Sequence, residues 1–287
     1  MAGLGLVGVL GADLARLTLG SHTHRAAFDD RQRGGSLVIG GGGPLPAEVL
    51  DRFAELAGGP RARIVVIPTA DPGASLVDPE EYAAPWRRRG VASVRVLNTL
   101  SRAEAEEPEF ARPLDGATGV WLTGGHQHWL GSAYAGTAVE RGIQGVLARG
   151  GAVGGTSAGA AALTRVMIDG GRGEAIEARG LDLLPGAVVD QHFLRRNRLG
   201  RLLGVLAKHP ELVGFGVDER TALVVRLGTM QLDVVGDSYA VACLPGASGG
   251  NPRLEFLKRG DRSTLDLLKT SPDAITSTAG LDALLSP

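Results

Sequence analysis

From residue 36 onward, short apolar runs alternate with longer segments in which apolar residues recur at helical spacing. The runs at 36–39 and 64–67 are typical of buried strands, and residues 46–57 carry an apolar helix face between them. Further strands are expected at 94–97, 120–122, 188–189, 213–217, 222–225, 232–235 and 239–244, and a further helix at 136–149. Because continuous apolar strands alternate with helices, the pattern predicts an α/β fold, a three-layer sandwich around a mainly parallel sheet. The last strands follow one another without helices, which predicts an antiparallel edge.

The N-terminal 35 residues differ from the rest of the chain. No repeat or linker divides residues 36–287, so we expect them to form a single domain after an N-terminal extension at residues 1–35. The apolar start of the extension lacks the basic residues of a signal peptide, and Asp13 and Arg16 interrupt it. It is also too short and too charged to span a bilayer, so we expect a cytoplasmic protein.

The balance of charges excludes several classes of function. The 287 residues carry 30 basic and 31 acidic side chains, and a net charge of −1 does not favour binding to nucleic acid or to a membrane surface. Aromatic residues make up only 4% of the chain, too few for stacking on bases. The single cysteine, Cys243, allows no internal disulfide, and no turn motif presents it as a nucleophile. We therefore expect neither nucleic acid nor a membrane among the partners.

The segment GTSAG at 155–159 lies between an apolar strand and the expected start of a helix at 158–163. This is the G-x-S-x-G pattern of a nucleophile elbow, in which glycines let strand and helix pack closely around a sharp turn. The turn projects the serine side chain, and N–H groups at the start of the following helix can stabilise an oxyanion. The pattern therefore predicts that Ser157 is the nucleophile of a covalent hydrolase.

Paired glycines follow the strand expected at 120–122. The backbone N–H groups of Gly125 and Ala158 are candidates for the oxyanion hole, and the side-chain amide of Gln127 is a further donor in the same turn. The alternative is an ordinary glycine-rich turn between a strand and a helix.

Two other strand ends carry groups that can assist a serine nucleophile. His192 follows the strand at 188–189 and is the candidate general base, since a serine hydroxyl needs one near neutral pH. Asp218 and Glu219 follow the strand at 213–217, and both are candidates for the carboxylate that orients the imidazole. Neighbouring residues of an extended chain point to opposite faces, so only one of the two would serve. Taken singly, these segments are equally compatible with a packed histidine and a solvated turn.

Several arginines follow the candidate base directly. Arg198 and Arg201 are three residues apart and are expected on one face of a helix, with Arg196 in its first turn. A solvated basic face is the alternative. Because arginine binds carboxylates through paired hydrogen bonds, the position of these side chains beside His192 suggests a substrate with carboxylate groups.

Together and in this order, these segments resemble the cyanophycinases of serine peptidase family S51. The matching segments are GGTSAGA at 154–160, GLDLLPGAVVDQHF at 180–193, R-x-R-x-x-R at 196–201 and GFGVDERTA at 214–222, with GGGG at 40–43 and LTGG at 122–125. The resemblance covers residues 36 to 245. It implies a fold like that of class I glutamine amidotransferases, which is flavodoxin-like.

The resemblance implies a triad of Ser157, His192 and Glu219, and it thereby selects Glu219 over Asp218. The residues that it implies for substrate binding are Gln127, Asp190, Gln191, Arg196, Arg198 and Arg201. Members of the family hydrolyse cyanophycin, a poly-aspartate backbone with arginine on each β-carboxyl, to β-Asp-Arg dipeptides. This chain has His126 where the family usually has aspartate, which allows a different substrate preference.

We therefore predict a serine-type exopeptidase that acts on cyanophycin through an acyl-enzyme, in a homodimer, without a metal or an organic cofactor. His126 and His128 form too small a set for a closed metal site. The alternatives are an isoaspartyl or aspartyl dipeptidase of the same family and, from another class, a non-catalytic binding protein on this fold. The intact triad argues against a binding protein.

Overall fold

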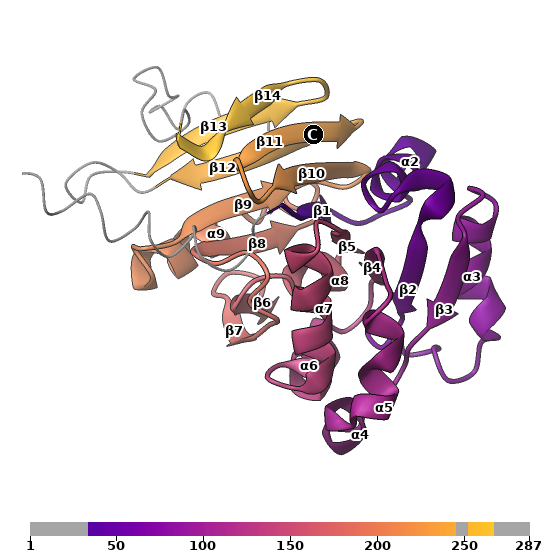
Figure 1. Cartoon of the computed structure of the whole chain (residues 1–287). Helices are drawn as coiled ribbons and strands as arrows, with labels where there is room; N and C mark the ends of the chain where they lie inside the picture. The colour runs from indigo at the N-terminus through magenta and orange to yellow at the C-terminus, as the bar shows by residue number, and fades with distance from the viewer. Residues whose placement is uncertain (1–33, 245–251, 267–287) are drawn as a thin grey trace, which may run out of the picture.

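The computed structural model describes residues 34–244 and 252–266 (Figure 1). The extension expected at residues 1–35 lies almost entirely outside this part, as do residues 267–287 of the expected domain. None of the helices in the described part is long and apolar enough to cross a lipid bilayer.

An eight-stranded sheet forms the centre of the molecule, in the order β14-β11-β10-β1-β5-β4-β2-β3 (Figure 1). Its strands are β1 (Ser36–Gly40), β2 (Arg63–Ile67), β3 (Ser93–Val96), β4 (Gly119–Leu122), β5 (Ala152–Thr156), β10 (Thr221–Arg226), β11 (Gln231–Gly236) and β14 (Arg262–Thr264). The pairings among β1 to β5 are all parallel, and β10, β11 and β14 extend the sheet in antiparallel fashion from β1. The predicted α/β class and the antiparallel edge are thus confirmed.

A second, four-stranded sheet has the order β13-β12-β9-β8. It consists of β8 (Ala187–Gln191), β9 (Val213–Val217), β12 (Tyr239–Leu244) and β13 (Arg253–Lys258), and only β8 and β9 are parallel. A separate hairpin pairs β6 (Val166–Gly170) with β7 (Ile176–Arg179). The apolar pattern does not distinguish these strands from those of the larger sheet, because strand partners are chosen by contacts far apart in sequence.

Helices cover both faces of the large sheet. The helices α2 (Ala47–Leu56) and α3 (Pro79–Arg87) lie on one face. The short 3₁₀ helix η1 (Gly59–Arg61) follows α2 in the chain. The other face is covered by α4 (Arg102–Glu106), α5 (Pro108–Ala111), η2 (Arg112–Leu114), α6 (Gln127–Tyr134), α7 (Ala138–Ala148) and α8 (Ala158–Ala161). The helix α9 (Leu199–Lys208) packs on the outer face of the second sheet.

Alternation along each central strand divides the core into two parts. Val38 packs with α2 and α3, whereas its neighbours Leu37 and Ile39 pack on the opposite side, with α7 and the second sheet. All three side chains are fully buried. Because both faces of β1 are covered, the strand is apolar throughout, as the sequence predicts.

The helix after β5 is shorter than expected, since α8 ends at Ala161 rather than near residue 163. The chain turns there because the N–H of Leu181 donates to the carbonyl of Ala162, and the N–H of Leu183 donates to that of Leu163. The apolar run is therefore buried as a turn instead of continuing as a helix.

Candidate active site

Ser157 occupies a strained turn between β5 and α8. Its backbone has φ 52° and ψ −111°, a conformation that is costly for a residue with a side chain. The N–H of Ser157 donates to the carbonyl of Gly40 at 2.9 Å, and a Cβ atom at Gly155 would lie 2.5 Å from the carbonyl carbon of Gly159. Close packing of strand and helix thus requires the two flanking glycines and forces the serine outward, as in a nucleophile elbow.

The structure brings Ser157, His192 and Glu219 together. Ser157 Oγ lies 2.8 Å from Nε2 of His192, and Nδ1 of the same ring lies 2.7 Å from Oε1 of Glu219. His192 follows β8, and Glu219 lies two residues beyond the end of β9. Since β8 and β9 are parallel neighbours in register to their last residues, their carboxyl ends lie side by side. The nucleophile therefore comes from the large sheet and its two partners from the second sheet.

Asp218, the other carboxylate at this strand end, has different partners. It accepts hydrogen bonds from the N–H of Arg195 at 2.9 Å and from the hydroxyl of Ser238 at 2.8 Å. Glu219 stands in the turn that follows β9 rather than in an extended segment, and the two carboxylates contact different groups. The geometry at His192 therefore favours Glu219.

A glycine loop after β1 packs against the His192–Glu219 pair. Sequence reasoning did not identify this contact. The N–H of His192 donates to the carbonyl of Gly41 at 2.7 Å. A Cβ atom at Gly42 would lie 2.4 Å from Cε1 of His192, and one at Gly43 would lie 3.1 Å from a carboxylate oxygen of Glu219. The run of four glycines at a strand end was the available signal for this close approach.

The charge state of the imidazole suits a proton acceptor. Burial lowers the pKa of His192, the hydrogen bond with Glu219 opposes this shift, and the positive charge of Arg196 adds to it. The hydrogen bond with His192 in turn lowers the pKa of Glu219. At neutral pH the ring is therefore neutral and the carboxylate charged, the pairing that a general base requires.

The turn after β4 lies beside the serine. A Cβ atom at Gly124 would lie 3.5 Å from Cβ of Ser157, and Gly125 has φ +135° with the carbonyl of Ala70 where a side chain would be. Ala158 is the first residue of α8, so its N–H has no acceptor within the helix. Both expected oxyanion donors thus come from elements next to Ser157.

A cavity of about 470 Å³ opens at this position. The predicted residues that line it are Ser157, His192, Gly125, Gln127, Gln191, Arg196, Arg198 and Arg201. Asp190 is absent from this lining. Asp169 to Arg172, in the β6–β7 hairpin, line it without having been predicted. The hairpin gave no motif that could have indicated its position.

Asp190 does not line the cavity and instead pairs with Arg201. Its carboxylate is fully buried and accepts hydrogen bonds from Nε and Nη2 of Arg201, the first at 2.9 Å. Arg201 also donates to the carbonyl of Gly171 at 2.7 Å, so it joins β8 to the hairpin tip. Asp190 and Arg201 therefore form a hydrogen-bonded ion pair in this structure. A direct role of either residue in substrate binding stays a prediction.

The other two arginines of the run differ in exposure. Arg198 is half-buried and donates to the carbonyl of Gln191 at 2.7 Å, and burial together with Arg201 lowers its pKa to about 10. Arg196 is exposed at the cavity. The expectation that Arg196 lies in the first turn of a helix is wrong, because Asn197 adopts φ 46° and α9 begins at Leu199.

Gln127 contacts the hairpin backbone. Its Nε2 donates to the carbonyl of Ile168 at 3.0 Å and to that of Asp169 at 2.7 Å. The rings of His126 and His128 lie 5.8 Å apart, centroid to centroid, beside Trp129. Within residues 34–244 and 252–266, no group of three or more potential ligand side chains could hold a metal ion.

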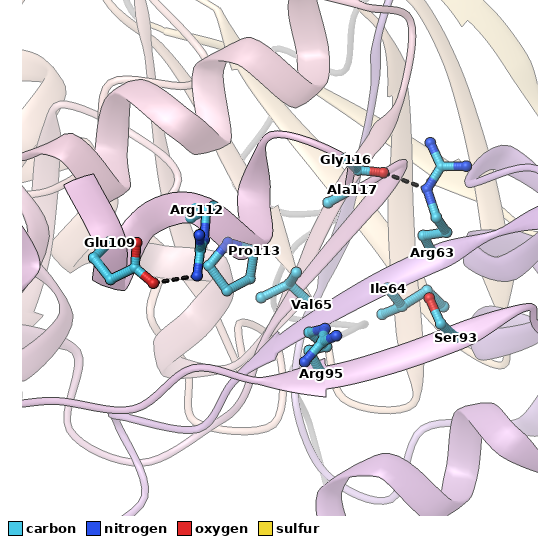
Figure 2. Close-up of a pocket in the computed structure, with 10 residues that line it drawn as sticks. All are labelled: Arg63, Ile64, Val65, Ser93, Arg95, Glu109, Arg112, Pro113, Gly116 and Ala117. Carbon is cyan, nitrogen blue, oxygen red and sulfur yellow. Dashed lines mark hydrogen bonds and ion pairs between the residues drawn. The ribbon is translucent and has the colours of Figure 1, made fainter.

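Another cavity, of about 510 Å³, opens at the amino ends of β2 and β3 (Figure 2). Arg63, Arg95 and the ion pair of Arg112 with Glu109 line it. Of the described residues that line it, only Ser93 carries a hydroxyl, and none is a histidine. The cavity at Ser157, at the carboxyl ends of the strands, is therefore the better candidate for chemistry.

The chain is similar to known peptidases and cyanophycinases. The model of "Peptidase family S51" matches residues 36–232. A cyanophycinase of Geminocystis herdmanii is 35% identical over 254 residues, which cover 80% of this chain and 93% of that protein. A cyanophycinase of Trichormus variabilis is 37% identical over 199 residues, 66% of each chain. The crystal structure of a peptidase from an acI-B1 Actinobacterium is similar with a TM-score of 0.61 at 26% identity, covering 83% of this chain and 99% of that one.

Proposed function

Because this chain belongs to peptidase family S51, as its sequence predicts, we propose that it is a serine-type exopeptidase that degrades cyanophycin to β-Asp-Arg dipeptides through an acyl-enzyme. The observation that carries the proposal is the continuous contact from Ser157 through His192 to Glu219, at 2.8 and 2.7 Å. The two related cyanophycinases support the substrate.

In the first step, Ser157 Oγ attacks the carbonyl carbon of the scissile aspartyl peptide bond while Nε2 of His192 accepts the hydroxyl proton. Nδ1–H of His192 donates to Glu219, which orients the ring and stabilises its charged form. The glycine loop against the ring supports this role, because it leaves the imidazole little room to rotate away from Ser157.

The tetrahedral intermediate carries its charge on the former carbonyl oxygen, which accepts hydrogen bonds from the N–H groups of Gly125 and Ala158. His192 then gives its proton to the leaving amine, and the carbon–nitrogen bond breaks. A water molecule, activated by His192, hydrolyses the serine ester and releases the acid. These reaction steps use only groups of the protein and water.

Cyanophycin presents carboxylates that suit the basic side of the cavity. Each arginine is attached through its α-amino group to a β-carboxyl, so its α-carboxylate stays free. Arg196 and Arg198 both line the cavity. The guanidinium group of arginine binds carboxylates with paired hydrogen bonds. Gln127, Asp190 and Arg201 are also proposed to bind substrate, and their hydrogen bonds hold the strand and hairpin that form the cavity wall.

Two alternatives would share parts of this site. An isoaspartyl or aspartyl dipeptidase would use the same triad on short peptides, and His126 in place of the usual aspartate is the feature that favours it. A non-catalytic binding protein on this fold would not need the Ser157–His192 contact. Covalent labelling of Ser157 by a fluorophosphonate would exclude a binding protein.

The test is mass spectrometry of the products released when the purified full chain is mixed with insoluble cyanophycin, beside a Ser157→Ala control. Release of β-Asp-Arg by the wild type alone supports the substrate and the nucleophile together. Release by both proteins would contradict the mechanism. Cleavage only of short isoaspartyl or N-terminal aspartyl peptides would favour the dipeptidase.

We also propose a cytoplasmic homodimer in which residues 36–287 form one domain. The near-neutral charge and the single cysteine support the location, and the family resemblance supports the dimer. Sedimentation equilibrium of the full chain tests the oligomeric state. Limited proteolysis tests the domain, which should yield one stable fragment that begins near residue 36.

A further inference from the structure

The side chains that line the active-site cavity carry charges of both signs. The basic ones are Arg172, Arg196, Arg198 and Arg201, of which Arg201 is neutralised by Asp190. Among the described residues that line the cavity, Asp169 is the single acid. A substrate that carried only carboxylates would gain nothing from this group, so its presence requires an explanation.

Asp169 lies on β6 with one carboxylate oxygen unsatisfied. Its side chain is 24% exposed, yet Oδ1 is inaccessible to solvent and accepts no hydrogen bond from any residue in the described part of the chain. The nearest basic atom is Nδ1 of His128 at 3.7 Å, beyond hydrogen-bond distance. A shielded carboxylate oxygen without a donor is unfavourable, so a positive charge close to the Asp169 carboxylate would stabilise it.

The backbone of Asp169 is held from two sides. Gln127 donates to its carbonyl at 2.7 Å from the start of α6, the helix that follows β4. Arg201 donates to the carbonyl of Gly171 at 2.7 Å from α9 and is itself fixed by Asp190. Asp169 is therefore attached to the same framework as Ser157 and His192, and it can be positioned as accurately as they are.

We propose that Asp169 is the receptor for the guanidinium group of the substrate, a specificity-determining residue for arginine-bearing β-aspartyl chains. The proposal rests on the proposed function and adds to it a contact that recognises the positive charge of the substrate. A guanidinium donates charge-assisted hydrogen bonds to a carboxylate, and the 24% of the Asp169 side chain that is exposed can accept them. The other charged side chains that line the cavity are arginines, so Asp169 is the group that offsets repulsion of a cationic side chain.

The site thereby binds both charged groups of each substrate arginine, its α-carboxylate and its guanidinium. Arg196 and Arg198 bind its α-carboxylate, and Asp169 binds the opposite end of the same residue. A chain of unmodified poly-aspartate would meet a repulsive carboxylate at Asp169. A chain with neutral side chains would leave Asp169 without its partner, so it would bind less tightly.

The test compares two synthetic substrates that differ only in this group. One is a (β-Asp-Arg) trimer, and the other has citrulline in place of each arginine, which keeps the shape but has no charge. The wild type should have a kcat/KM about 10- to 100-fold higher for the arginine form, as expected for a charged hydrogen-bonded pair. Asp169→Asn should abolish this preference by raising KM for the arginine form.

Glu174→Gln is the matched control, because Glu174 lies in the same hairpin, is 83% exposed and pairs with Lys208 outside the cavity. It should keep the wild-type preference. If Asp169→Asn lowers kcat for both substrates equally, or leaves the preference intact, the proposal is overturned.

A binding measurement separates this proposal from the proposed function. In a Ser157→Ala background, calorimetry gives the Kd of the arginine and citrulline dipeptides without turnover. A preference for the arginine dipeptide that disappears in Ser157→Ala/Asp169→Asn supports the receptor role, and equal Kd values with Asp169 present overturn it. Absence of turnover of either trimer by the wild type would instead contradict the proposed function.

Discussion

The imidazole of His192 lies against Gly42, where a Cβ atom would be 2.4 Å from Cε1 of the ring. Gly42 also has φ +102°, a backbone conformation that side chains disfavour. The ring thus has the glycine loop on one side and Ser157 and Glu219 at its two nitrogens. Its orientation depends on the absence of a single methyl group.

Gly42→Ala should therefore lower kcat by about 10²-fold or more, since a displacement of about 1 Å at a reacting group has that effect. The ring must shift, and its contact with Ser157 lengthens. Steady-state kinetics with circular dichroism checks this, because the protein should still fold. Gly204→Ala, in α9 with no neighbouring atom within 4 Å, is the control and should keep activity while gaining about 0.4–1 kcal/mol of stability. Wild-type kcat in Gly42→Ala would contradict the role of the loop.

The pH profile of kcat/KM should report the His192–Glu219 pair. Activity requires neutral His192, so kcat/KM rises with pH as the ring loses its proton, and the lowered pKa places this limb below the usual histidine range. Arg196→Gln removes a positive charge that lowers the pKa, so the limb should move to higher pH. Glu219→Gln removes the group that raises the pKa, so the limb should move to lower pH while kcat falls.

Arg88→Gln, at the exposed end of α3, should leave the limb in place. A shift in the same direction for Arg196→Gln and Glu219→Gln would show that His192 is not the titrating group.

Loss of Arg201 should destabilise the protein strongly. Its side chain is 3% exposed, and that of Asp190 is fully buried, so Arg201→Met leaves the buried carboxylate with only the longer contact to Arg198, at 3.5 Å. The expected loss is about 3–5 kcal/mol in urea unfolding. Asp190→Asn/Arg201→Met removes both charges and should cost less than the single change.

The exposed pair of Arg87 with Glu80 provides the comparison for that experiment. Arg87→Met should change stability by less than about 1 kcal/mol. Equal effects of Arg201→Met and Arg87→Met would mean that the buried pair is not a structural link.

Cys243 should be unreactive in the folded protein. It is fully buried in β12, and burial raises the pKa of its thiol to about 12. Because the thiolate is the reactive form, iodoacetamide should label it only after unfolding. Rapid labelling of the native protein, followed by intact mass, would refute this, and prior reaction of Ser157 with a fluorophosphonate should not change the result.

Sequence reasoning found the parts of the site that depend on local turn chemistry. Ser157 was evident because an elbow needs small residues on both sides, and His192 was evident because it follows an apolar strand. Glu219 could not be chosen over Asp218 from the residues alone, because side-chain direction at a strand end depends on the local backbone. Family resemblance made that choice.

The features that the sequence could not predict depend on contacts between distant segments. The pairing of Asp190 with Arg201 spans 11 residues and requires β8 and α9 to pack together. The division of the strands into two sheets likewise depends on which strand edges meet. Asp169 stands in a short segment without periodicity, so neither its strand nor its place in the lining of the cavity was apparent.

The β6–β7 hairpin pairs with neither of the larger sheets, yet its tip forms one wall of the cavity. The nucleophile and its base are held elsewhere, by β5 and β8. Residues at the hairpin tip can therefore be exchanged during evolution without disturbing the elements that hold the reactive groups. Diversification of substrate range within this scaffold would accumulate there, and a library confined to residues 169, 170, 172 and 173 would be the most direct route to new specificities, since Gly171 has φ +91° and no room for a Cβ atom.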